Sequence, residues 1–111
     1  MKPKQYTIKI ASPEEVTSKI FDDFGSELHV DICRAIVTAV HDKIEYVEVA
    51  TFHVYSIDDH KLMSIEFAVR GDEFLRSLQL NLPFVVELEE YELAAEIRDT
   101  IEYLEATKSL D

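Results

Sequence analysis

The chain has 111 residues, of which 47% are hydrophobic and only five are glycine or proline. A chain of this length can bury about two-thirds of its unfolded surface in one core, so the composition excludes a disordered or low-complexity protein. The formal net charge is −12, which disfavours direct binding to nucleic acid or to an anionic membrane. Only three lysines near the N-terminus, Lys2, Lys4 and Lys9, could form a basic patch, and three are too few to hold a phosphate backbone.

The number of cysteines and the hydropathy of the chain indicate the cellular compartment. Cys33 is the single cysteine, so an intrachain disulfide and a paired-cysteine metal knuckle are excluded, and a reducing compartment is expected. No apolar stretch has the length of a signal peptide or of a membrane-spanning helix. We therefore expect a soluble, cytoplasmic protein.

The N-terminal part of the chain predicts a strand followed by helix. Residues 5–10 alternate apolar and polar side chains, as a half-buried strand does. Ser12 can cap a following helix, and Glu15 lies where it could complete a capping box. Apolar residues then recur every three or four positions, with Gly25 between two such runs, so either one bent helix or two helices fit residues 13–43.

Two further strands are predicted in the middle of the chain. Residues 45–57 and 61–70 are rich in β-branched and aromatic side chains and flank a turn-forming segment, which favours a β-hairpin. Alternate residues of the second run are apolar, so one face of the sheet should be covered. These residues are Met63, Ile65, Phe67 and Val69.

Together these elements predict an α+β fold. We expect a small antiparallel sheet of residues 5–10, 45–57 and 61–70, covered on one face by the helices of residues 13–43. A short helix capped by Asp72 should follow, interrupted at Asn81-Leu82-Pro83. Residues 1–80 would then form an α+β domain, with an acidic helical hairpin of residues 82–110 packed on it as one compact domain.

Negative charge is concentrated in this C-terminal segment. Between residues 87 and 105, eight carboxylates are opposed only by Arg98, so seven of the twelve net negative charges lie in 19 residues. An apolar stripe runs through the same segment at spacings of four, four and three, which a helix must bury against something. The stripe consists of Leu93, Ile97, Ile101 and Leu104.

Residues 88–105 closely resemble the UVR motif, the helical hairpin shared by the B and C subunits of bacterial nucleotide-excision repair and by some adaptor proteins. The core of that motif is an aromatic residue, two alanines and an Arg-Asp pair followed by an apolar residue. Here those positions hold Tyr91, Ala94, Ala95, Arg98, Asp99 and Ile101.

The resemblance implies a function. In that family the hairpin docks onto another protein, often a second copy of itself, and enzymatic activity resides in other domains. It therefore implies a non-enzymatic protein-protein interaction or regulatory module. The partner-binding residues expected on this basis are Tyr91, Leu93, Ala94, Ala95, Ile97, Arg98, Asp99 and Ile101.

Two features of the residues qualify this expectation. An ordinary acidic terminal helix would show the same pattern, with its apolar stripe in the core and its glutamates in solvent. Residues 82–86 are also more apolar than the polar helix that usually precedes the motif. We therefore expect one face of the hairpin to lie on its own domain and the other, around Tyr91 and Arg98, to face the partner.

Other chemistry finds little support. The four histidines do not stand at metal-ligand spacing, Cys33 falls on an apolar helical face, and the two glycines cannot build a phosphate-binding loop. We expect no catalytic residue, metal or cofactor. A ligand site on the sheet would need a pocket that the sequence does not reveal.

Two questions about partners stay open at this point. An acidic decoy or inhibitor of a nucleic-acid-binding protein, of the kind that phages encode, is the alternative function, because the charge could imitate a phosphate backbone. A homodimer is favoured over a monomer, through a free sheet edge or through the hairpin. The sequence identifies neither the protein partner nor the pathway.

Overall fold

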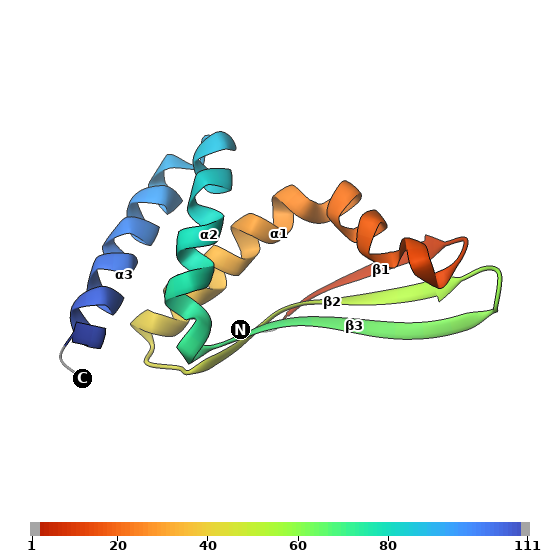
Figure 1. Ribbon diagram of the computed structural model, residues 1–111, viewed down its shortest axis with the longest axis horizontal. Coiled ribbons are helices and arrows are strands. Elements are labelled where there is room, and N and C mark those ends of the chain that lie inside the picture. The colour runs from red at the N-terminus through yellow and green to blue at the C-terminus, as the bar shows by residue number, and fades with distance from the viewer. Residues whose placement is uncertain (1–2, 110–111) are drawn as a thin grey trace.

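The computed structural model describes residues 3–109 of the chain and the side chains of residues 3–107. Lys2 and Leu110, which enter the predictions above, lie outside the described residues. The elements in chain order are β1 (Lys4–Ile10), α1 (Val16–His41), β2 (Tyr46–Ser56), β3 (Lys61–Arg70), α2 (Phe74–Glu87) and α3 (Tyr91–Ser109). Short 3₁₀ turns precede α1 and α2. The predicted α+β class and the C-terminal helical hairpin are confirmed (Figure 1).

The three strands form one sheet in the order β1-β2-β3. β3 is antiparallel to β2 as predicted, but β1 is parallel to β2, with Lys4 opposite Ala50 and Ile10 opposite Ser56. The prediction of an all-antiparallel sheet is therefore wrong for β1. The cause is α1, whose 26 residues span about 39 Å and return the chain along the sheet, so that β2 starts at the same end as β1.

One continuous helix, α1, covers the sheet. Gly25 does not break it, since a glycine costs an exposed helix interior only about 1 kcal/mol and the buried residues Ile20 and Leu28 hold the helix on either side. The expected capping box does not form. The Glu15 carboxylate accepts a hydrogen bond from the backbone N–H of Ala11 at 3.2 Å, and the Ser12 hydroxyl contacts Glu14 instead.

Alternate residues of β3 differ in burial as predicted. Met63, Ile65, Phe67 and Val69 are half-buried on the side of the helices, and the residues between them are exposed. The core beneath α1 includes an aromatic cluster in which the ring of Phe52 lies 4.8 Å from Tyr6, 5.4 Å from Phe24 and 5.6 Å from Phe67. The sheet therefore has one helix-covered face and one open face.

A second core lies where α2 and α3 pack on the C-terminal half of α1 (Figure 1). Each helix contributes three buried residues: Cys33, Ile36 and Ala39 from α1, Phe74, Leu78 and Val85 from α2, and Leu93, Ala94 and Ile97 from α3. Three half-buried residues contact both cores, namely Ile32, Val47 and Val69. The molecule is consequently elongated, with extents of 52 × 28 × 21 Å.

α2 is longer than expected. It runs without interruption from Phe74 through Pro83, so the break predicted at residues 81–83 is wrong and the first helix of the hairpin begins well before Leu82. A proline inside a helix removes one hydrogen bond and strains the preceding turn. Here Pro83 faces solvent, and burial of Leu78 and Val85 on either side offsets this cost.

Candidate docking surface on the helical hairpin

The turn between α2 and α3 sets the position of the hairpin tip. The N–H of Glu90 donates to the carbonyl of Val85 at 3.2 Å and the N–H of Glu89 donates to that of Val86 at 3.0 Å, which is a Schellman motif. Glu89 has a φ of 61°, a left-handed conformation that favours glycine. α3 then begins at Tyr91, at the tip of the hairpin.

This turn offers a stability test. Replacing Glu89 by glycine should raise the free energy of unfolding by about 0.5–1 kcal/mol, because the left-handed conformation is strained for any residue with a Cβ. The control is Glu87→Gly in the last turn of α2, where glycine should instead lower it by about 0.5–1 kcal/mol. Urea denaturation of both variants measures the two changes in the free energy of unfolding. A loss of stability in both variants would contradict the Schellman motif at Glu89.

The inner face of α3 belongs to the core of its own chain. Leu93, Ala94 and Ile97 are buried against α1 and α2, and Ile101 is half-buried beside them. These four residues belong to the expected partner-binding set, but the structure places them where a partner cannot reach them without displacing α3. Their role here is to fix the position of the helix.

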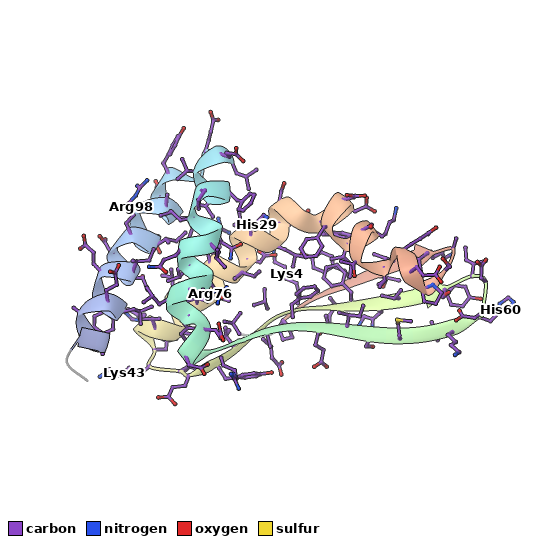
Figure 2. The ribbon with its side chains drawn as sticks, in the orientation of Figure 1. Lys4, His29, Lys43, His60, Arg76 and Arg98 are labelled. Atoms are coloured by element: carbon purple, nitrogen blue, oxygen red, sulfur yellow. The ribbon has the colours of Figure 1, made fainter. Side chains whose placement is uncertain are left out.

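The outer face of α3 contains the other four expected residues. Tyr91 is 62% exposed, and Ala95, Arg98 and Asp99 are exposed as well. Figure 2 shows Arg98 on the side of α3 turned away from α1. Within residues 3–107, Arg98 takes part in no ion pair, so its guanidinium is available to a carboxylate from outside.

Sequence reasoning missed an apolar row on α2. Leu80, Phe84 and Leu88 follow one another at a spacing of four and are 59%, 44% and 40% exposed. The ring of Phe84 stacks on His29 of α1, with centroids 4.0 Å apart and planes 1° from parallel. The spacing was visible in the sequence, but a buried row at Leu78 and Val85 shares the same helix, and periodicity alone does not tell which row faces solvent.

Charge is arranged asymmetrically around the hairpin. Glu92, Glu96 and Glu102 lie exposed on α3. Glu90 at the turn forms an ion pair with Arg34 of α1 at 3.7 Å, which ties the tip of the hairpin to α1. The outer surface of α3 is therefore strongly acidic, with Arg98 as its one described cation.

A groove of about 560 Å³ separates α1 from the first turns of α3. Its charged groups are partly paired, as in the contact of 2.9 Å between Lys4 Nζ and Asp31 Oδ1. Cys33 does not line this groove but lies in the second core; burial raises the pKa of its thiol to about 12, which makes it a poor nucleophile at neutral pH. In the part of the chain that the structure describes, no three His, Cys, Asp or Glu side chains lie together so that they could hold a metal ion. None of the helices in that part of the chain is long and apolar enough to cross a membrane.

Comparison with known proteins finds a family motif that matches the hairpin. A family model described as the UvrB/uvrC motif, UVR, matches residues 72–107, a range that takes in α2 and nearly all of α3. The match is longer than the segment recognised from the sequence, in agreement with the early start of α2. No curated protein matches the chain, and no solved structure does. The C-terminal third of the chain is therefore consistent with a UVR motif, which by itself is a non-catalytic interaction hairpin.

Proposed function

We propose that this protein is a non-enzymatic, regulatory protein-protein interaction module that docks a protein partner through the outer face of its α2–α3 hairpin. One observation carries the proposal: the inner face of α3 is consumed by the chain's own core, while Tyr91, Ala95, Arg98 and Asp99 stay exposed at motif positions. We place this activity in the cytoplasm and without direct contact to nucleic acid, since a net charge of −12 repels phosphate backbones.

The tip of the hairpin exposes residue types that are common at the centre of protein-protein interfaces. Tyrosine and arginine are over-represented among residues that dominate binding energy, because each combines a large contact area with a polar group. Tyr91 follows Leu88, the last residue of the exposed row, by three positions across the turn, and both side chains are exposed. Docking would bury the tyrosine ring and the leucine together and bring a partner carboxylate to Arg98.

A double substitution tests this proposal. Tyr91→Ala combined with Arg98→Glu should abolish the capture of partner proteins that the wild-type chain retains in a pull-down, while circular dichroism shows an intact fold. The matched control is Tyr46→Ala combined with Arg76→Glu, which makes the same chemical changes at exposed positions away from the tip. The proposal is wrong if the Tyr91 and Arg98 variant keeps every partner.

The acidic face of α3 supports a second candidate function. Glu92, Glu96, Asp99 and Glu102 are all exposed, and such a surface could occupy the basic site of a nucleic-acid-binding protein as a decoy. Ionic strength separates the two functions. Binding that collapses between about 50 and 200 mM salt, and that DNA competes away, would favour the decoy, whereas docking through Tyr91 and Leu88 should weaken only slightly.

A further inference from the structure

β3 is a free edge of the sheet. In the order β1-β2-β3 it pairs with β2 alone, so one side of its backbone has no strand partner among the described residues. Figure 1 shows β3 along the lower rim of the sheet, with all three helices above the sheet. Ten residues, Lys61–Arg70, form this edge.

This edge has few of the features by which proteins block association. Proteins protect edges with prolines, bulges, short strands or central lysines. β3 contains no proline, and the one register irregularity of the hairpin lies on the inner strand, between Glu48 and Ala50. The lysine of β3 stands at its first position, Lys61, and the arginine at its last, Arg70.

The helix side of β3 is also incompletely covered. α1 packs mainly on β2, which leaves the apolar row of β3 half-buried where the corresponding row of β2 is fully buried, as at Phe52 and Val54. A strand added beside β3 would cover the exposed half of Met63, Ile65, Phe67 and Val69. The edge therefore offers both unpaired backbone groups and apolar side chains.

Charge favours a second copy of this chain as the occupant. In a protein with a net charge of −12, most surfaces repel their own copies, and the outer face of α3 does so strongly. β3 differs because it carries two basic residues and a single acidic one, Glu66. It is thus an apolar surface on which two copies can meet without juxtaposed carboxylates, provided that the register keeps the two Glu66 side chains apart.

The alternation of the strand restricts that register. Two identical antiparallel strands related by a twofold axis place the same face of each strand on the same side only if the axis passes midway between the two copies of one residue. Nine residues of each copy pair when the axis passes between the two copies of Ile65 or between the two copies of Glu66. The axis at Glu66 would place the two Glu66 carboxylates directly opposite each other, which is unfavourable. With the axis at Ile65, Ser64 lies opposite Glu66 and Met63 lies opposite Phe67.

We propose that two copies of this protein pair antiparallel through β3, with the twofold axis at Ile65, to form a continuous six-stranded sheet. Both sets of helices lie on the same face of that sheet, and the two half-buried apolar rows join into one. The hairpins stay free for another partner, so the dimer presents two copies of the docking surface.

A pair of substitutions at Ser64 tests both the interface and its register. Ser64 is exposed, and its hydroxyl makes only a long contact of 3.5 Å with His53 Nδ1, so both variants should keep the fold by circular dichroism. Ser64→Glu sets two like-charge pairs against Glu66 of the other copy and should weaken dimerisation about fivefold, whereas Ser64→Lys should strengthen it about fivefold. Sedimentation velocity of the full chain over a range of concentrations measures both dissociation constants.

The outcomes decide the inference. A wild-type chain that stays monomeric up to about 0.5 mM would overturn it, and so would Ser64 variants that shift the dissociation constant in the same direction or not at all. The Tyr91→Ala and Arg98→Glu double variant should dimerise like the wild type, because the hairpin takes no part. Loss of the dimer in that variant, with no effect at Ser64, would place self-association on the hairpin and overturn the role of β3.

Discussion

Replacing Ala94 by glutamate should unfold the protein, whereas the same replacement at Ala95 should change the free energy of unfolding by less than about 0.5 kcal/mol. Ala94 is fully buried between α3 and the other two helices, and an unpaired carboxylate there costs several kcal/mol. Typical domains have only about 5–15 kcal/mol to lose. Ala95 faces solvent, so a longer polar side chain meets no obstacle.

Circular dichroism without denaturant tests whether each variant is folded, and urea denaturation measures the free energy of unfolding of any variant that is. Adjacent alanines of one motif make a sharp comparison, because composition, helix propensity and added charge are the same in both variants. Equal destabilisation of the two would mean that α3 is rotated from the position described. A folded Ala94→Glu variant would mean that the hairpin separates from α1 without unfolding the rest of the chain.

Replacing Phe52 by alanine should lower the free energy of unfolding by about 3–5 kcal/mol. Phe52 is fully buried in the middle of β2, and its ring lies within 6 Å of three other aromatic rings. Removing it leaves a cavity that the rigid sheet and α1 cannot close. The same measurement by urea denaturation gives the size of the loss.

Phe21 provides the matched control for this prediction. It is a half-exposed phenylalanine on α1, and its replacement by alanine should cost about 1 kcal/mol, since only part of its apolar surface leaves water on folding. A cost at Phe52 no greater than that at Phe21 would show that the aromatic cluster does not stabilise the sheet.

Local signals in the sequence predicted most elements but not their arrangement. The alternation around Ile65 was enough to assign β3 and its covered face, because strand periodicity depends on neighbouring residues alone. The direction of β1 depends instead on the length of α1, which Gly25 left ambiguous. The predicted break at Pro83 is wrong for a related reason. The destabilising effect of a proline on a helix is evident from the sequence, whereas the burial of Leu78 and Val85 that offsets it is a property of the folded chain.

At the candidate site, too, the local pattern is predictable from the sequence and the packing is not. The sequence predicts the motif positions, yet it does not separate Ala94 from Ala95, because an amphipathic pattern shows which residues share a face and not what covers that face. Leu93 and Ile97 were therefore assigned to a partner that the chain itself replaces. The exposed row around Phe84 is not predictable from the sequence, because the buried and the exposed apolar residues of α2 alternate along the same helix.

The two cores share residues of α1, β2 and β3, and this sharing affects the energetics of binding. Ile32, Val47 and Val69 contact both cores, so opening of either core removes packing from the other. A ligand that binds only the native form raises the free energy of every opening reaction that destroys its site. A protein held at the hairpin tip would therefore slow hydrogen exchange in β2 as well, and the sheet would report occupancy of a surface it does not touch.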